Sequence, residues 1–192
     1  PDLIKPIFHS RNIGPFKNYL FVHEIAKGDY IAHMDGDDFW FPDKLEQQIN
    51  FLQTHSECSA VYTNAVVITE FQKPIGIFNK RLPEVFDSNY LLQKGNFLNH
   101  SSLIYRGSIR TKILNFDGNF IDYHVHLRCS LYGNLGYINN IYVGYRRIST
   151  GISSNSSVMI RGLYWKALME MHKAKKYTPM LKNAISDFMA SI

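Results

Sequence analysis

Apolar and polar positions alternate along the chain in helical and extended patterns. Apolar side chains recur at helical spacing in residues 15–23 and 44–52, and a short apolar strand is predicted at residues 30–34. The apolar run at residues 60–68 has the length of a buried strand, and residues 99–106 predict another strand that begins with polar side chains. Helices and strands that follow one another in this order indicate an α/β protein.

The C-terminal half continues this pattern and then becomes helical. Residues 121–131 predict a helix, and two short strands are expected at 134–138 and 142–146. After the polar stretch Ser153-Ser154-Asn155-Ser156-Ser157, two amphipathic helices are predicted, with Thr178 and Pro179 at the start of the second. We therefore expect an α/β domain at residues 1–152 and a helical extension at 153–192 that packs on the domain or on a partner.

Composition is that of a folded globular chain. Its 192 residues are 45% hydrophobic and 14% aromatic, enough to bury one core. The net charge of +5 suits an anionic ligand or lipid, but the basic residues are dispersed and no nucleic-acid-binding motif is present, so we expect no nucleic-acid partner. Cys58 and Cys129 are far apart, as is typical of reduced thiols.

Three carboxylates follow the strand at residues 30–34. Asp35, Asp37 and Asp38 surround Gly36 in the loop after that strand, where ligands bind in open α/β sheets. Hard oxygen ligands close together suit Mg²⁺ or Mn²⁺ that also holds phosphate oxygens. A solvated acidic turn is the alternative, because Asp and Gly are ordinary turn residues.

The residues around the acids carry a family resemblance. The run A-K-G-D-Y-I-A-H-M-D-G-D-D-F-W-F-P-D-K-L-E-Q-Q, at residues 26–48, resembles the central motif of the family 2 glycosyltransferases at nearly every fixed position. The resemblance implies a GT-A fold, which is a Rossmann-like, mixed and mostly parallel sheet flanked by helices. We expect this fold to be N-terminally truncated here and followed by C-terminal helices.

A second block supports the resemblance. Residues 120–127 and 132–146 are similar to the family segment in which an acid begins a helix and a Gly-Tyr pair and a Tyr-Arg pair follow. The resemblance makes Asp122 the general base that deprotonates the acceptor hydroxyl. Stabilisation of a helix start by Asp122 is the alternative. His126, four residues on, is a candidate partner of Asp122 on the same helix face.

The resemblance also implies ligands for the remaining site residues. Asn12, Gly14, Asp35 and Arg146 would contact the donor, a nucleotide-diphosphate sugar that is expected to be a UDP-sugar. Asp35 and Asp37 would hold Mn²⁺ or Mg²⁺. The implied reaction is sugar transfer with inversion to a saccharide or lipid-linked acceptor in the biosynthesis of a cell-surface polysaccharide.

Further expectations concern the surroundings of the site. His100 and Ser101 are candidates for the acceptor side of the site. A loop histidine more commonly only forms hydrogen bonds with its neighbours, which is the alternative for His100. No apolar run approaches a membrane span of about 18 residues, and the family setting implies a cytoplasmic protein with a candidate peripheral contact at the inner membrane face. An exposed sheet edge and the C-terminal helices are candidate surfaces for oligomer formation.

Two departures from the family pattern leave an alternative function open. The chain begins at Pro1, near the end of the region that holds the nucleotide base in the family, and Ile148 stands where many relatives have a His near the metal. Both features favour a non-catalytic remnant that binds a carbohydrate or a protein partner. The intact acids Asp35, Asp37 and Asp122 favour an enzyme.

Overall fold

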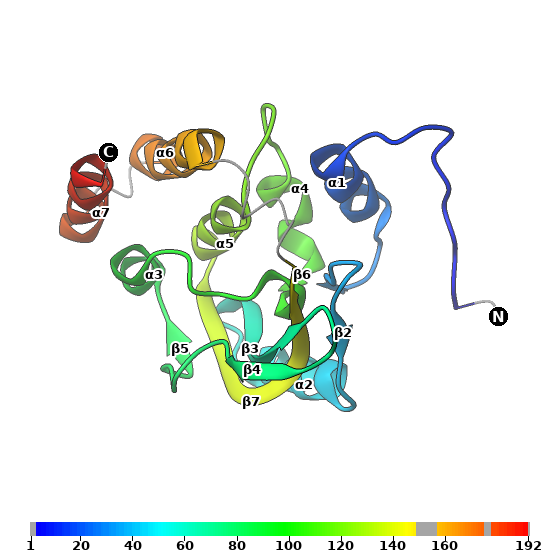
Figure 1. The fold of residues 1–192 in the computed structure, drawn as a ribbon. Coiled ribbons are helices and arrows are strands. Elements are labelled where there is room, and N and C mark those ends of the chain that lie inside the picture. The colour runs from blue at the N-terminus through cyan, green and yellow to red at the C-terminus, as the bar shows by residue number, and fades with distance from the viewer. Residues whose placement is uncertain (1–2, 149–156, 175–177, 192) are drawn as a thin grey trace.

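A mixed sheet with helices on both faces forms the centre of the molecule (Figure 1). The computed structural model describes residues 3–148, 157–174 and 178–191. The strands are β1 (Tyr30–Ala32), β2 (Phe39–Trp40), β3 (Cys58–Thr69), β4 (Pro74–Ile77), β5 (Val85–Phe86), β6 (Ile104–Arg106) and β7 (Asn134–Arg147). They form the order β1-β6-β3-β7-β2, with β4 also paired to β3 and β5 to β7. The predicted α/β class with a mixed, helix-flanked sheet is confirmed.

The expectation that most strands would be parallel is wrong. Among the described residues only β3 and β7 pair in parallel, and the other five pairings are antiparallel. Parallel strands need a long crossover, and residues 70–133 provide one between β3 and β7. The connection from β3 to β4 is instead a turn of residues 70–73, which can only return the chain antiparallel.

β7 is a single strand where the sequence predicted two. It pairs with β3 from Cys58 opposite Asn134 to Thr69 opposite Arg147, and irregularities beside Asn64 absorb the residues that were expected to break it. At Gly136 the aromatic ring of Phe51, in α2, occupies the space that a Cβ would need. The glycine of the Gly-Tyr pair is therefore needed for close packing of the neighbouring helix on the strand.

The helices cover the two faces unequally. The helical segments are α1 (Pro15–Ile25), α2 (Lys44–Thr54), α3 (Ser88–Lys94), α4 (Arg110–Ile113), α5 (Asp122–Ser130), α6 (Ser157–Lys173) and α7 (Pro179–Ala190), with short 3₁₀ turns η1 (His100–Ser102) and η2 (Gly107–Ile109). In Figure 1, α2 lies against the sheet on the side away from the other helices. A small core of Phe51, Leu52, Cys58, Val61 and Ile104 fills that side, and the larger core fills the other.

The buried face of α2 differs from the predicted one. Leu45 is 44% exposed, whereas Lys44 and Gln48 are buried beside Phe51 and Leu52. The Gln48 amide donates to the carbonyl oxygens of Val61 and Ser102, at 3.0 and 2.8 Å, which offsets the cost of burying it. The predicted apolar stripe of Leu45, Ile49 and Leu52 is therefore buried only in part, at Leu52, because the bonds of Gln48 to β3 and η1 turn the polar side chain inward while Leu45 faces solvent.

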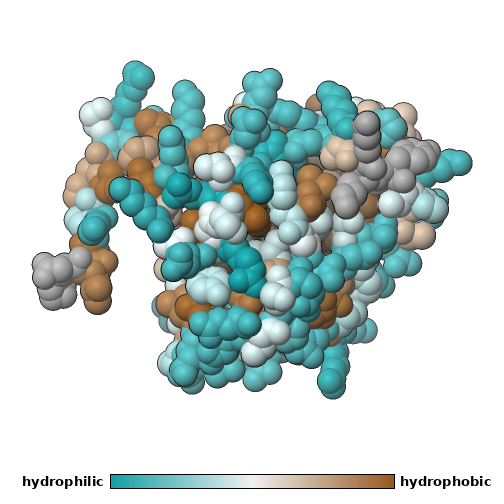
Figure 2. Space-filling model, turned by 180° about the vertical axis from the view of Figure 1, so that it is seen from behind, coloured by the Kyte–Doolittle hydropathy of each residue, from teal (hydrophilic) through white to brown (hydrophobic). Residues whose placement is uncertain are grey.

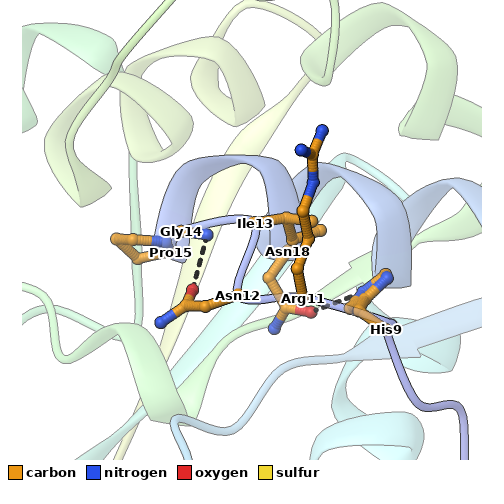
Figure 3. Close-up of a pocket in the computed structure, with 7 residues that line it drawn as sticks. All are labelled: His9, Arg11, Asn12, Ile13, Gly14, Pro15 and Asn18. Carbon is orange, nitrogen blue, oxygen red and sulfur yellow. Dashed lines mark hydrogen bonds between the residues drawn. The ribbon is translucent and has the colours of Figure 1, made fainter.

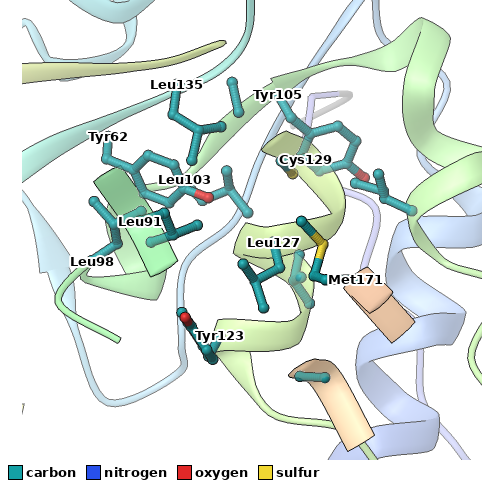
Figure 4. Packing of buried hydrophobic residues seen from close by; sticks show 14 of the residues in the cluster. Tyr62, Leu91, Leu98, Leu103, Tyr105, Tyr123, Leu127, Cys129, Leu135 and Met171 are labelled. Atoms are coloured by element: carbon teal, nitrogen blue, oxygen red, sulfur yellow. The ribbon is translucent and has the colours of Figure 1, made fainter. Parts of the chain in front are cut away.

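The C-terminal helices share the larger core. Ala167, Leu168 and Met171 of α6 and Leu181 of α7 are buried in the same cluster as α3 and α5. Figure 4 shows Met171 beside Leu127 of α5. The helix that the sequence predicted to begin near Ser157 is confirmed, whereas residues 153–156 of the polar stretch lie outside the described residues. The division at residue 152 stays a prediction.

The N-terminal arm, at residues 3–13, lies apart from the body of the molecule (Figures 1 and 2). Leu3, Ile4, Ile7 and Phe8 are 97%, 75%, 50% and 88% exposed. The arm is the segment that leads into α1, and Figure 2 shows hydrophobic atoms along it. Within the described residues, the apolar side chains of the arm therefore contribute little to the core.

A charged group fixes α6 onto α5. Glu170 of α6 accepts hydrogen bonds from Arg128 Nε and Nη2, at 2.6 and 2.8 Å, and lies 2.6 Å from His124 Nε2. Arg128 is buried, donates to the Ile113 carbonyl and lies 3.7 Å from the centre of the Phe116 ring. Burial by itself would raise the pKa of Glu170, but the bonds from His124 and Arg128 lower it to about 2.

We predict that Glu170→Gln lowers the free energy of unfolding by about 1–3 kcal/mol at neutral pH, because it weakens charge-assisted bonds to a buried Arg128. The folded-state pKa is lowered, so this contribution is present above the unfolded pKa of about 4.5 and is lost as pH falls towards about 2. Urea unfolding across this pH range measures the difference between variant and wild type.

The matched control is Glu24→Gln on α1, because Glu24 is exposed and forms no ion pair with any described residue. It should change stability by less than about 0.5 kcal/mol. A Glu170→Gln loss that stays constant from neutral to acid pH would show that the ion pair is not its source.

Candidate functional site

The acid loop, residues 33–38, joins the two strands at the ends of the sheet order, β1 and β2. It starts with a bond from the His33 amide to the Leu103 carbonyl and closes with a turn in which the Asp38 amide donates to the Asp35 carbonyl. β2 then pairs with β7, with Phe39 opposite Gly144. The loop is therefore attached to β6 and η1 on one side and to β7 on the other.

Asp35 is held through both oxygens of its carboxylate. Oδ1 lies 3.0 Å from His33 Nε2, and Oδ2 accepts a 3.2 Å bond from the Ser101 hydroxyl. The same hydroxyl accepts the Asp35 amide at 2.9 Å. Burial opposes ionisation of Asp35, but the bond from His33, the nearby His100 and the Ser101 bond together lower its pKa. Asp35 is therefore a fixed carboxylate at neutral pH.

Asp38 is buried and holds the loop to β7. Its Oδ1 accepts the Arg146 amide at 2.8 Å, whereas its Oδ2 has no hydrogen-bond partner among the described residues. Burial raises the pKa of Asp38 to about 6, against the opposing effect of the bond from the Arg146 amide. This contact shapes the loop by holding it to β7.

Asp37 is the free acid of the three. Its side chain is exposed, and its carboxylate makes no hydrogen bond to a described residue. Its carbonyl accepts a 2.9 Å bond from Arg146 Nε, and Arg146 Nη1 donates to the Glu70 carbonyl at 3.3 Å. Arg146, predicted to bind the donor, thus lies beside the acid loop with part of its guanidinium bound to backbone carbonyls.

Asp122 begins α5 and is brought close to the acid loop. It is exposed to solvent on one side, while protein packed around the rest of the carboxyl raises its pKa. His126 opposes this rise, and the negative charge of Asp35 adds to it, which means that Asp35 and Asp122 lie within electrostatic range. Asp122 is the acidic residue in the first turn of α5, and the preceding residue, Ile121, provides no side-chain cap. Stabilisation of the helix start by Asp122 therefore stays an alternative to a catalytic role.

The neighbouring histidines have different partners. His126 is fully buried and lies 3.1 Å from His100, through Nε2 and Nδ1, so its bond is not to Asp122. His100 is also buried, at 6% exposure, and does not line an open acceptor surface, whereas Ser101 binds Asp35 directly. Ser101 was predicted only as a candidate for the acceptor side. Its bonds to Asp35 were not predicted, because η1 meets the acid loop only in the folded chain.

Asn12 and Gly14 shape the entry to α1. The Asn12 side chain accepts the Gly14 amide at 2.8 Å, and Gly14 has a φ of 81°, which favours glycine (Figure 3). With His9, Arg11, Ile13, Pro15 and Asn18 they line a pocket of about 420 Å³. The two residues thus have a local structural reason for being present. Their predicted contact with a donor remains a prediction.

A divalent cation fits this loop in one limited way. No three His, Cys, Asp or Glu side chains of the described residues come together as a metal site, and Ile148, half-buried after β7, has no ligand atom. The free carboxylate of Asp37 and the half-exposed Asp35 supply two sets of hard oxygens. Mg²⁺ commonly binds through one or two carboxylates together with substrate phosphates. The residues therefore fit a cation that is bound together with its substrate.

The chain belongs to glycosyl transferase family 2, whose model matches residues 1–114. It is 30% identical to the Escherichia coli UDP-Glc:alpha-D-GlcNAc-diphosphoundecaprenol beta-1,3-glucosyltransferase WfaP over 168 residues, covering 80% of this chain and 63% of that protein. It is 34% identical over 109 residues to the putative glycosyltransferase EpsE of Bacillus subtilis, covering 56% of this chain and 37% of EpsE.

Two further comparisons concern length and fold. An uncharacterised Mycobacterium tuberculosis protein is 28% identical over 172 residues, covering 86% of this chain and 48% of that protein, so the chain spans about half the length of such relatives. The crystal structure of Staphylococcus aureus TarS residues 1–349 matches with a TM-score of 0.67 at 15% identity, covering 92% of this chain and 52% of that one. This match confirms the GT-A fold. No helix among the described residues is long and apolar enough to cross a membrane.

We predict that the adjacent acids Asp37 and Asp38 differ in their effect on stability. Asp38→Ala leaves the Arg146 amide without its acceptor and should lower the free energy of unfolding by about 1–2 kcal/mol. Asp38→Asn keeps an acceptor oxygen and should lose less. Thermal unfolding of the metal-free variants measures both.

Asp37→Ala is the matched control and should change stability by less than about 0.5 kcal/mol, because its carboxylate is exposed and unbonded. Equal losses in the Asp37 and Asp38 alanine variants would contradict the assignment of Asp38 as the residue that holds the loop to β7.

Proposed function

We propose that this protein is an inverting, metal-dependent glycosyltransferase that moves a sugar from a nucleotide-diphosphate sugar to a hydroxyl of a saccharide or lipid-linked acceptor. The observation that carries the proposal is that a fixed acid, Asp35, and a free acid, Asp37, share one loop and that the charge of Asp35 acts on a solvent-accessible acid of raised pKa, Asp122. Family membership supplies the reaction class.

Asp122 is the proposed catalytic base. Its carboxylate would take the proton of the acceptor hydroxyl while that oxygen attacks the anomeric carbon and the bond to the diphosphate oxygen breaks. A single displacement of this kind inverts the configuration at the anomeric carbon. A pKa raised above the ordinary carboxyl value suits a base, because it strengthens the affinity of the carboxylate for the proton that it would accept.

The acid loop is the proposed donor site. Asp35 is held by His33 and Ser101 with little freedom to turn, so it could meet the donor ribose or cation at low entropic cost. Asp37 and Asp35 would hold Mn²⁺ or Mg²⁺. Arg146 lies beside Asp37, and its positive guanidinium would interact with the negative diphosphate. When bound, the cation supplies charge neutralisation to the departing diphosphate.

The donor and the pathway are proposals of the same kind. TarS was crystallised in complex with UDP-GlcNAc, and WfaP is named for a UDP-Glc donor and a diphosphoundecaprenol-linked acceptor. These relatives favour a UDP-sugar donor and a role in cell-surface polysaccharide synthesis. A place at the inner face of the cytoplasmic membrane would bring the site to a lipid-linked acceptor.

We predict that Asp122→Asn reduces transfer at least 100-fold in the protein that carries this chain, since removal of a general base costs about 10²–10⁴-fold. Product formation from UDP-sugars, followed by mass spectrometry, measures it. The acidic limb of the kcat/KM profile should lie above the ordinary aspartate pKa of about 3.9.

Asp117→Asn is the matched control, because Asp117 is an exposed acid in the connection before α5 and should leave transfer within about twofold. Undiminished transfer in Asp122→Asn would remove Asp122 from the role of base. Wild-type protein that binds saccharide but forms no product with any UDP-sugar would favour the alternative of a binding module.

We predict weak donor binding by the 192-residue chain itself. The segment that leads into α1 stands away from the body with its apolar side chains exposed, so little surface around the Asn12 pocket is fixed to receive a base and ribose. Calorimetric titration with UDP, with and without Mn²⁺, measures the affinity. Tight binding that requires Mn²⁺ would contradict this expectation and support a complete donor site.

A further inference from the structure

Four imidazole rings gather beneath the acid loop, although their residues are scattered along the sequence. His23 comes from α1, His33 from the end of β1, His100 from η1 and His126 from α5. His23, His100 and His126 are buried. The ring centre of His33 lies 5.1 Å from that of His23 and 4.6 Å from that of His100. No His, Cys, Asp or Glu group of the described residues has the geometry of a metal site, so the rings need another explanation.

Three hydrogen bonds connect part of this cluster into an unbranched chain. The Tyr105 hydroxyl lies 2.7 Å from His23 Nδ1, His23 Nε2 lies 3.0 Å from His33 Nδ1, and His33 Nε2 lies 3.0 Å from Asp35 Oδ1. The chain therefore runs from β6 through α1 to the acid loop. His100 contacts His33 ring to ring, and its own bond goes to His126, so it is not part of the chain.

The end of the chain at Asp35 determines where each proton lies. An ionised carboxylate can only accept, so His33 donates to it from Nε2, and in a neutral His33 ring Nδ1 is then an acceptor. His23 must then donate through Nε2 and accept through Nδ1, which leaves Tyr105 as the donor. Each imidazole is neutral in this arrangement, and burial, which lowers the pKa of His23 to about 3, favours the neutral ring.

The rings are also fixed in their planes. Tyr19 stacks on His23, with ring centres 4.1 Å apart and 29° between planes, and its ring centre lies 5.0 Å from that of His33. Ser101 holds the second oxygen of Asp35 at 3.2 Å. The carboxylate therefore has one oxygen bound to the histidine chain and one to η1, and rotation of the carboxylate would break both bonds.

We propose that Tyr105, His23 and His33 are positioning residues that orient the Asp35 carboxylate through an ordered chain of hydrogen bonds. Partners of this kind that orient a ligand typically change metal affinity or activity by about 10–100-fold when removed. The effect on transfer rests on the proposed function, whereas the order of protons in the chain is a property of the folded protein alone.

The proton positions are tested by nitrogen-15 NMR of the histidine rings in the metal-free chain at neutral pH. We expect His23 and His33 to be neutral and protonated on Nε2. Tyr105→Phe removes the donor to His23 Nδ1, so the signal of that nitrogen should move towards the value of an unbonded ring nitrogen. Tyr132→Phe, at an exposed tyrosine outside the cluster, is the matched control and should leave the His23 signal in place.

Two substitutions of His23 test the consequence for Asp35. Both His23→Leu and His23→Gln lose the ring that stacks on Tyr19, but the Gln amide can still donate to His33 Nδ1. We expect His23→Leu to lower kcat/KM for UDP-sugar by about 10-fold or more and His23→Gln to recover most of it. Thermal unfolding of each variant confirms that the chain is folded, and Tyr105→Phe provides the same test with a smaller change.

The outcomes separate the two proposals. A proton on Nδ1 of either His23 or His33, or a His23 signal that ignores Tyr105→Phe, overturns the hydrogen-bond chain. Equal losses in folded His23→Leu and His23→Gln overturn the positioning role. A wild-type protein that shows the expected proton positions but transfers no sugar would support the hydrogen-bond chain. That result would contradict only the proposed function.

Discussion

The parallel pairing of β3 with β7 is the constraint on which the rest of the structure depends. The two strands pair from Cys58 opposite Asn134 to Thr69 opposite Arg147, with shifts of register along the way. Because α5 leads directly into the start of β7 and the acid loop is bound to its end through Asp38, a single strand sets the distance between Asp122 and the loop. A parallel pair needs a long crossover, and here that crossover carries η1, which binds Asp35, and α5, which carries Asp122.

Polar groups buried around this pair hold the site in place. Gln48 joins α2 to η1 and to β3, Trp40 donates to the Ser101 carbonyl at 2.8 Å, and Arg128 joins α5 to α6. Each of these groups loses water when buried, and each recovers hydrogen bonds that only the folded chain offers. Because these hydrogen bonds are directional, they fix the position of the elements that carry the acids.

The residues of the site differ in how far they could be predicted. The acids and their loop follow from local sequence, because a strand that ends in Asp-Gly-Asp-Asp places them at a strand end wherever the strand lies. His100 and Ser101 were candidates only for the acceptor side, and the contacts of Ser101 and His23 around Asp35 could not be predicted locally, since η1 and α1 bring them there. One local signal was present: His33 lies two residues before Asp35, and such residues share a face of an extended segment.

The sequence by itself determined the family, the α/β class, most helices and strands, and which acids could act, because motif spacing and hydrophobic period are local properties. Tertiary structure decided the direction of strand pairing, the continuity of β7 and the buried polar face of α2, which depend on crossover length and on partners distant in sequence. It also decided that three neighbouring acids differ: Asp37 free, Asp38 buried and Asp35 fixed. The reason is that burial and hydrogen bonding, which set the pKa and orientation of a carboxylate, come from residues that meet only in the folded chain.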